Sequence, residues 1–402
     1  MLRSALCLVA LAAHSGAAAT DLCLGECSTN AAGVKTCSFD FSIDIYASET
    51  GYYKVKNCMG TQPTLGMEAG VEYTFKQYDN TNHYHPLGFA YFADGAHTGV
   101  DELEPGINNG GDPYCTPAAN DCMTPKYYID GAFAGAAGDA SDFGLDVYEP
   151  DFKTPKEEWV AKQYAVKLTV TDPEAKDFFY FCHIHSMMSG RVKVLQADGS
   201  VRQVANLPAL GYSYAELSSF DRDCGTYGLS AYSDTADVCP GMSFVCGIDG
   251  HNSPKQQKFG RCLAAADCAM HVGMRSDLHA SDPTVTFMHQ MIPHHLNAVM
   301  MAKTLLKDGT YAPNDEIEAL LYDIINVQNM QVMTMRDFLM TGAYPKTDRC
   351  LHEGATNGDH GHDHGRDSLS LALAAIALGV SLVVLILHVA TASSKASASP
   401  QK

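Results

Sequence analysis

The stretch FFYFCHIHSMMSGRVKV, residues 178–194, decides the fold of the first half of this chain. Its two ends are rich in aromatic and β-branched residues, which predicts β-strands. In the loop between them, Cys182, His185 and Met188 follow a C-x2-H-x2-M pattern. A thiolate, an imidazole and a thioether are three of the four groups of a type 1 copper site, which also needs a second histidine. The alternative is a cysteine that only packs in a core.

Short runs on both sides of this loop alternate apolar and polar residues, which is typical of half-buried strands in a sandwich or barrel. They are TCSFDFSIDIYA (36–47), YYKVKN (52–57), VEYTFKQY (71–78), YAVKLTV (164–170), FFYF (178–181) and GRVKVLQ (190–196). Residues 93–155 are rich in Gly, Asp, Asn and Pro and predict a loop-rich insertion, partly closed by Cys115 and Cys122. The first domain is therefore expected over residues 20–200.

The missing histidine has a candidate in NHYHPLGFAYF, residues 82–92, where His85 follows a predicted strand. Together with the cysteine loop, this region resembles the cupredoxins, the blue-copper family with a Greek-key β-sandwich. The loop is similar to the short ligand loop of amicyanin-like members, and HPLGF looks like the family's upstream histidine motif. The resemblance implies His85, Cys182, His185 and Met188 as copper ligands. It also favours Met188 over Met187 as the axial ligand, because the family's methionine sits just before the glycine that opens the last strand.

Two more histidines complete H-x-H pairs beside the predicted ligands, His83 and His183. They are either further metal ligands or loop and surface histidines. A trinuclear oxidase cluster would need more histidine pairs than these two, so an oxidase is not expected. The chain offers no Ser/His/Asp or paired-carboxylate constellation either, so copper binding or electron transfer is expected rather than catalysis.

A helical pattern begins at residue 282 and follows a segment, 201–281, with five cysteines and little periodicity. That segment predicts a Cys-rich, disulfide-knit connector. The runs VTFMHQMIPHHLNAVMMAKTLL (285–306) and EIEALLYDIINVQNMQVMTMRDFLM (316–340), joined by a turn-like segment, predict an antiparallel helical hairpin over 282–342. The chain is thus expected to be multidomain, with β structure first and α structure after it.

Soft side chains recur along both predicted helices. Those that could converge between the helices are Met291, His294, His295, Met301, Met330 and Met333. Imidazoles and thioethers favour copper, Cu(I) above all. Methionines at helical spacing also fill cores, and we expect Met300 and Met340 to be such core residues.

The second domain, from Asp282 to Leu339, looks like the domain-of-unknown-function family numbered 305, a ferritin-like helical fold. Its hallmark is an M-I-P-H-H phrase followed by an alanine and M-A-K. Some members are associated with periplasmic copper binding and tolerance. The matching positions are Met291, Pro293, His294, His295, Ala298, Met301, Ala302, Lys303, Gln328, Met333 and Met335. Gln331 stands where the family often has a glutamate, so a carboxylate ligand is not expected there.

The two ends of the chain predict its compartment. Residues 1–19 have the layout of a signal peptide. Residues 368–390 are apolar over a length that can cross a hydrocarbon core of roughly 30 Å. A type I single-pass membrane helix with a cytoplasmic stub at 391–402 is favoured over a lipid anchor, whose signal normally ends in its apolar tail. Residues 343–367 predict a stalk, in which His360, His362 and His364 either collect metal weakly or belong to a solvated spacer.

Charge and cysteine number fit this picture. The chain carries a formal charge of −19, which argues against nucleic acid and is compatible with cations as partners. Of 14 cysteines, Cys7 leaves with the signal peptide. If Cys182 is the odd thiol, the other twelve could form three disulfides before it and three after it, with connectivity left open.

The expected function is that of a membrane-anchored copper protein at the cell surface or an endomembrane, with its main domains outside the cytoplasm. It would capture, buffer or pass on copper, with a redox or copper-transfer protein as a partner. The alternative is a cupredoxin electron carrier whose helical domain serves for docking. The first function predicts several exchangeable coppers per chain, and the second a stable blue centre.

Overall fold

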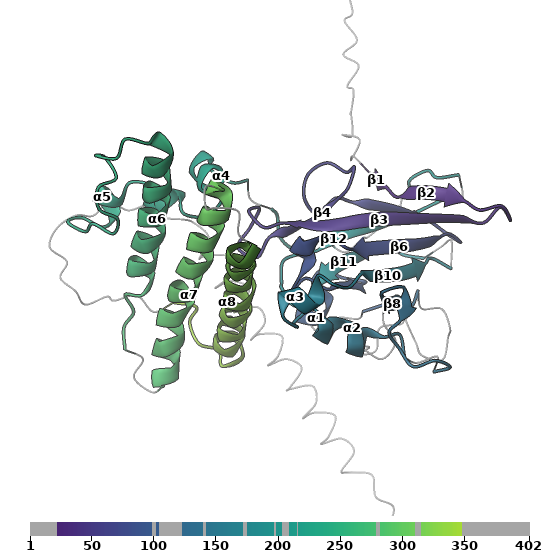
Figure 1. Cartoon of the computed structure of the whole chain (residues 1–402). Coiled ribbons are helices and arrows are strands. Elements are labelled where there is room, and N and C mark those ends of the chain that lie inside the picture. The colour runs from purple at the N-terminus through teal and green to yellow at the C-terminus, as the bar shows by residue number, and fades with distance from the viewer. Residues whose placement is uncertain are drawn as a thin grey trace, which may run out of the picture. The chain divides into compact units, whose positions relative to one another are not determined.

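The structure is a computed structural model that describes residues 22–98, 102–103, 123–139, 142–171, 175–196, 198–202, 209–214, 216–278, 282–309 and 315–347 (Figure 1). All of these residues belong to one compact unit, residues 1–350. The predicted signal peptide, most of the stalk with its histidines, the 368–390 segment and the 391–402 stub lie outside the described residues. Within the described part, no helix is long and apolar enough to cross a membrane. A β-sheet domain followed by a helical domain confirms the predicted order.

The first sheet has five strands in the order β1-β5-β12-β11-β7. Their bounds are β1 Cys23–Leu24, β5 Leu65–Glu68, β12 Gly190–Leu195, β11 Phe178–Cys182 and β7 Leu87–Ala90. The central pair, β11 and β12, runs antiparallel on either side of the 183–189 loop. Strand β7 pairs antiparallel with β11 and brings Leu87 opposite Cys182. The predicted strands at both ends of the opening stretch are therefore confirmed.

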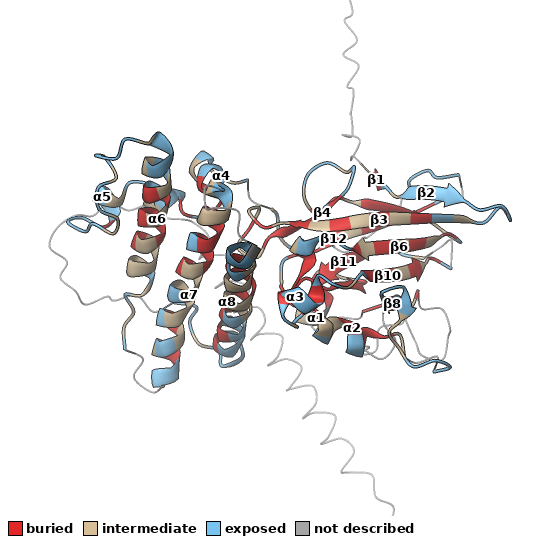
Figure 2. Ribbon diagram, in the orientation of Figure 1, coloured by how far each residue is buried: buried red, intermediate tan, exposed pale blue. Residues whose placement is uncertain are grey.

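The second sheet has seven strands, ordered β2-β3-β6-β10-β8-β9 with β4 paired to β3. Their bounds are β2 Glu26–Thr29, β3 Lys35–Asp44, β6 Glu72–Gln77, β10 Tyr164–Thr169, β8 Lys126–Ile129, β9 Ala132–Phe133 and β4 Tyr52–Val55. The polar–apolar alternation predicted for the long strands is confirmed, since every second side chain of β3 and β6 is buried (Figure 2). Such alternation places one face of a strand in the core.

The two sheets pack face to face through aromatic side chains. Phe41 of the second sheet lies 5.4 Å, between ring centroids, from Tyr180 of the first. Phe75 of the second sheet lies 4.8 Å from Phe89 of the first, edge to face. Aromatic pairs in this geometry add to the burial of apolar surface. The domain is consistent with a β-sandwich.

The described part of residues 93–155 contains more regular structure than its composition predicts. It forms α1 Gly95–Thr98, β8, β9 and α2 Leu145–Asp151, and α3 Lys156–Trp159 follows it; the short 3-10 helix η1, Asn80–Asn82, precedes it. Strand β8 pairs with β10 and buries Tyr127 fully. The run KYYI is only four residues long between turn formers, so tertiary pairing rather than local periodicity determines this strand.

The helical domain contains three long helices, α6 Pro254–Gly273, α7 Pro283–Asp308 and α8 Asp315–Thr341 (Figure 1). Smaller elements precede them: α4 Ser219–Cys224, η2 Ser230–Tyr232 and α5 Thr235–Val238. The predicted hairpin of α7 and α8 is confirmed. Helix α7 is capped at its start by Asp282, whose side chain accepts from the N–H of Thr284, and at its end by Gly309 with φ +62°. Both are favoured helix ends.

Helix α6 lies within the segment predicted as a connector. Its buried side chains are mostly small, Ala264, Ala265 and Ala266 among them. Small apolar residues give a weak 3.6-residue pattern although they suit close helix packing. This is why the sequence did not indicate a 20-residue helix here.

Four disulfides join described cysteines: Cys23–Cys58, Cys27–Cys37, Cys224–Cys262 and Cys239–Cys268. Cys182 is free and buried, as its predicted role requires. Cys246 is also free, and exposed, so the expectation that it belongs to a disulfide is wrong. Cys115, Cys122 and Cys350 lie outside the described residues.

The α7–α8 hairpin contacts the sandwich at the β3–β4 turn. Lys303 donates from Nζ to the carbonyls of Ser48 and Glu49, at 2.8 Å each. Arg336 forms two hydrogen bonds with the Glu49 carboxylate, at 2.5 and 3.0 Å. Helix side chains such as Val299, Ala302, Leu321 and Ile325 belong to the same buried cluster as the sandwich core.

Candidate metal centre

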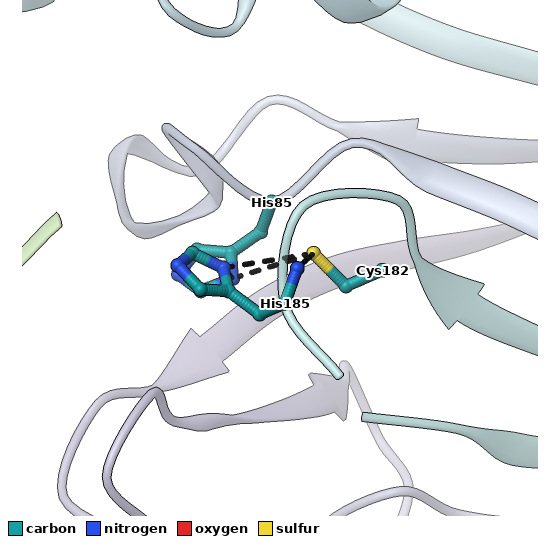
Figure 3. A group of neighbouring side chains, drawn as sticks. All are labelled: His85, Cys182 and His185. Atoms are coloured by element: carbon teal, nitrogen blue, oxygen red, sulfur yellow. Dashed lines mark hydrogen bonds between the residues drawn. The ribbon is translucent and has the colours of Figure 1, made fainter. Parts of the chain in front are cut away.

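Three atoms that could bind a metal ion lie close together: Nδ1 of His85, Sγ of Cys182 and Nδ1 of His185 (Figure 3). The sulfur lies 3.8 Å from His85 Nδ1 and 3.7 Å from His185 Nδ1. The two nitrogens are 3.2 Å apart. In the part of the chain that the structure describes, this is the one group of three His, Cys, Asp or Glu side chains with metal-site spacing.

The triangle has the size of a metal-ligand set. Its three edges define a circle with a radius of about 2.1 Å, so an ion at the centre would lie at that distance from all three atoms. For comparison, zinc binds histidine nitrogen at about 2.0–2.1 Å and cysteine sulfur at about 2.3 Å. The residues therefore fit a trigonal metal site.

Burial sets the protonation of the three groups. Cys182 and His185 are fully buried and His85 is nearly so. Desolvation raises the pKa of Cys182 to about 12 and lowers the pKa of His185 to about 3. The pKa of His85 is also well below its ordinary value, first because of burial and then because of the nearby His185. Both imidazoles are thus neutral at pH 7 and keep a lone pair for a metal.

The backbone of His85 is held by two buried polar side chains. Gln77 Nε2 and Tyr53 OH donate to the His85 carbonyl, at 2.6 and 2.8 Å. The Gln77 amide oxygen accepts from Leu87 N–H and Tyr148 OH, both at 2.9 Å. Gln77 is fully buried at an inward position of β6, where the alternation calls for an apolar residue. A polar residue at such a position was the one sequence signal for this support.

The cysteine side of the site is held by hydrogen bonds within the loop and from α1. The His185 N–H donates to the Cys182 sulfur at 3.3 Å. His97 Nε2 donates to the Cys182 carbonyl at 2.8 Å. Hydrogen bonds to ligand residues orient them, as in well-characterised metal sites. His97 lies in the segment whose composition predicts loops, and the sequence carried no signal for it.

The predicted axial residue lies beside the triangle in the chain. Met188 is fully buried, whereas Met187 is 51% exposed. The N–H groups of both residues point to the Asp94 carboxylate. Exposure thus separates Met187 from the buried ligand set.

His83 and His183 lie outside the triangle; His83 is buried, and the side chain of His183 is only 4% exposed although the residue as a whole is half-buried. His83 donates from Nε2 to the Thr154 carbonyl at 2.8 Å, and its ring lies 5.4 Å from that of Trp159. His183 lies between the carboxylates of Glu102 and Glu149, at 4.0 and 3.9 Å. Burial lowers the pKa of His83 to about 4 and that of His183 to about 3, so both are neutral at pH 7.

The predicted ligands of the helical domain are more accessible. His294 is exposed, His295 is half-buried with its Nδ1 buried, and Met301 is 39% exposed. Met291, Met330 and Met333 are half-buried. Burial lowers the pKa of His295, partly opposed by hydrogen bonds to Gln331 and Gln328 of α8. Met300 is buried, as expected of a core residue, but Met340 is 69% exposed and does not fill the core.

Comparison with known proteins gives one family. Residues 269–371 match the family described as "Domain of unknown function (DUF305)", which confirms the predicted membership of the helical region. The match begins in α6 and continues past the described residues. No curated protein matches the chain, and no solved structure does. The sandwich has no family match of its own, so its resemblance to the cupredoxins stays a prediction.

Proposed function

We propose that this chain is a copper-binding protein whose sandwich is a cupredoxin domain with one type 1 site. His85, Cys182 and His185 would hold the ion, with Met188 as the axial ligand. The buried His85–Cys182–His185 triangle is the observation that carries this proposal. Two imidazoles and one thiol in trigonal arrangement, with a methionine on the same loop, suit copper. Such an ion accepts and releases one electron.

Core packing explains the cluster less well than a metal does. Packing alone gives no reason to bury two imidazoles with their Nδ1 atoms 3.2 Å apart and a thiol beside them. Buried polar groups cost free energy unless they have strong partners, and a metal ion satisfies all three at once. In a chain with four described disulfides, a free buried cysteine also needs a reason to stay unpaired.

For the role of this copper we favour capture, buffering or transfer. The accessible soft side chains of the helical domain, His294 and Met301, could take up copper that the buried site cannot receive directly. The electron-carrier alternative has its own support, because ligands that are 0–1% exposed would retain their ion through redox cycles. In both cases we propose a single-pass membrane protein on the secretory route, with its domains outside the cytoplasm and a redox or copper-transfer partner.

The first test loads the full chain, purified in a mild detergent, with copper. We expect an intense visible absorption band, because a buried thiolate ligand gives copper its colour, and we expect its loss in Cys182→Ser. Cys246→Ser is the matched control, since Cys246 is the other free cysteine among the described residues and is exposed. A colourless copper-loaded wild type would refute the type 1 site. A wild type that binds zinc more tightly than copper would make this a zinc site instead.

A second arm of the same experiment separates the two roles. Copper bound per chain is measured under reducing conditions in wild type and in the His294→Ala/His295→Ala double variant, with exposed His251→Ala as control. Copper handling predicts about two or more ions in wild type and a loss only in the double variant. Equal stoichiometry and affinity in all three proteins would favour the electron carrier.

A further inference from the structure

The Asp94 carboxylate accepts several hydrogen bonds from the loop that follows Cys182. Oδ2 accepts from the Met187 N–H at 3.0 Å, and Oδ1 accepts from the Met188 N–H at 3.3 Å. Oδ1 also accepts from the hydroxyl of Ser189, at 2.8 Å. Asp94 itself is only 6% exposed. One buried carboxylate thus contacts three consecutive residues, the middle one being the predicted axial ligand.

Asp94 and Met187, which share one of these hydrogen bonds, both have a backbone conformation that is uncommon for residues other than glycine. Asp94 has φ +57° and Met187 has φ +60°, and neither is a glycine. Left-handed conformations of non-glycine residues persist where the surroundings hold them, and they gather at functional sites. The direct hydrogen bond from Met187 to Asp94 joins the two. The conformation of the methionine pair therefore depends on this carboxylate.

A second set of contacts closes the network at the start of β12. Ser189 is fully buried, and its hydroxyl accepts from the Asp94 N–H at 2.8 Å. Tyr212 OH donates to Asp94 Oδ1 at 3.1 Å and accepts from the Ser189 N–H at 3.0 Å. Tyr214 OH donates to the Ser189 carbonyl. The loop is thus fixed at the point where β12 begins.

We infer that Asp94 is the positioning residue of the metal site, which fixes the backbone of Met188 and with it the place of the axial thioether. This inference rests on the proposed function. The axial ligand tunes the reduction potential of a type 1 copper, and groups that orient ligands usually affect metal affinity about 10- to 100-fold. Asp94 acts through the hydrogen bonds that it makes with the loop.

Two substitutions grade the effect. Asp94→Asn keeps the shape of the side chain and one acceptor oxygen. Its NH2 group replaces Oδ2 and therefore places a donor against the Met187 N–H, which is also a donor. Asp94→Ala removes every acceptor and leaves buried N–H groups unpaired. Both also remove a buried negative charge from the loop that carries Met188, which would favour the lower-charged Cu(I) state. Tyr212→Phe removes one hydroxyl and leaves Asp94 in place.

The test uses the copper-loaded full chain in mild detergent, and measures visible spectrum, reduction potential and copper affinity. We expect a changed spectrum and a higher reduction potential in Asp94→Asn. At the same solution potential, the ratio of oxidised to reduced copper should fall at least tenfold, which corresponds to a rise of about 59 mV for one electron. Asp94→Ala should change these values more and Tyr212→Phe less. We also expect affinity to fall about 10- to 100-fold in Asp94→Ala.

Asp177→Asn is the matched control. Asp177 is a buried aspartate of the same domain that accepts from the Val194 N–H at 3.0 Å, next to the opposite end of β11 from Cys182. It should lower stability without changing the spectrum or the potential. Unchanged spectrum and potential in Asp94→Asn and Tyr212→Phe, with a blue wild type, would overturn the role of Asp94 alone. A wild type without the blue band would refute the proposed function itself.

Discussion

Lys303 of α7 is fully buried against the sandwich, where desolvation lowers its pKa from 10.5 to about 7. Nearby Glu49 and Asp44 partly oppose this shift. The amine donates to two carbonyls, those of Ser48 and Glu49. A neutral amine has two N–H groups and can still make both hydrogen bonds. The ordering of this turn therefore does not need the positive charge.

Lys303 gives the folded protein a defined pH dependence. Between about pH 7 and 10.5 the unfolded chain binds a proton at this lysine that the folded chain has lost, so stability rises with pH by up to about 1.4 kcal/mol per unit. Below pH 7 both states are protonated and the contribution is flat. We expect Lys303→Met to lose this slope in urea unfolding of copper-free protein, relative to the exposed control Lys307→Met. Equal slopes in all three proteins would contradict it.

At the scale of single residues, local spacing indicated the proposed ligands but not the residues around them. Cys182, His185 and Met188 share one loop, and His85 stands in a phrase that resembles a family motif. The structure brings His85, Cys182 and His185 together. Asp94 and His97 reach the loop from a segment with no periodic pattern. Their roles depend on long-range packing of α1 against β11, which spacing along the chain does not encode.

At the scale of elements, the sequence was most informative where one face of an element is buried and the other exposed. Strands β3 and β6 alternate strictly, and α7 has an aspartate and a proline at its start and a glycine at its end. Strand β8 and helix α6 lacked those signals, one because it is short and the other because its buried face is alanine-rich. Both are fixed by partners elsewhere in the chain.

The helical domain depends on a disulfide that joins two of its elements. Cys224 of α4 bonds Cys262 of α6 across a separation of 38 residues. A loop of that size predicts a loss of about 4 kcal/mol on replacing both cysteines, against about 3 kcal/mol for Cys27–Cys37 with its separation of 10 residues. Urea unfolding of the two double Cys→Ala variants measures the difference. A larger loss for Cys27–Cys37 would contradict the prediction.

At the scale of the molecule, the hairpin and the sandwich share one buried cluster and a set of polar contacts. Asn329 Nδ2 donates to the Glu49 carbonyl at 3.1 Å, and Asn326 Nδ2 donates to the carbonyl of His83, at 3.4 Å. His83 is two residues from His85 of the triangle. A structural change at the candidate metal site thus has a short route to α8 through the 83–85 backbone.

This coupling predicts that sandwich and helices unfold in one transition. Trp159 is the single tryptophan and lies buried in the sandwich, stacked on Tyr164, so its fluorescence reports on the unfolding of that domain. Far-ultraviolet circular dichroism is dominated by the long helices. Coincident curves from the two probes are the signature of one cooperative unit. We expect coincidence in wild type, and if the proposed copper site is correct, copper should raise both midpoints together because it would bind the folded state.

The interface can be weakened without touching the metal ligands. The Asn326→Ala/Asn329→Ala double variant removes two side-chain donors that α8 offers to the sandwich, at a cost of roughly 1–3 kcal/mol. In this variant copper should still raise the fluorescence midpoint, while its effect on the helical signal falls. Asn297→Ala, which removes an α6–α7 contact to Asp267 instead, is the matched control and should keep the two curves together. Separate transitions in wild type would mean that the helical domain folds independently. Copper bound to the sandwich would then not change the stability of the helical domain.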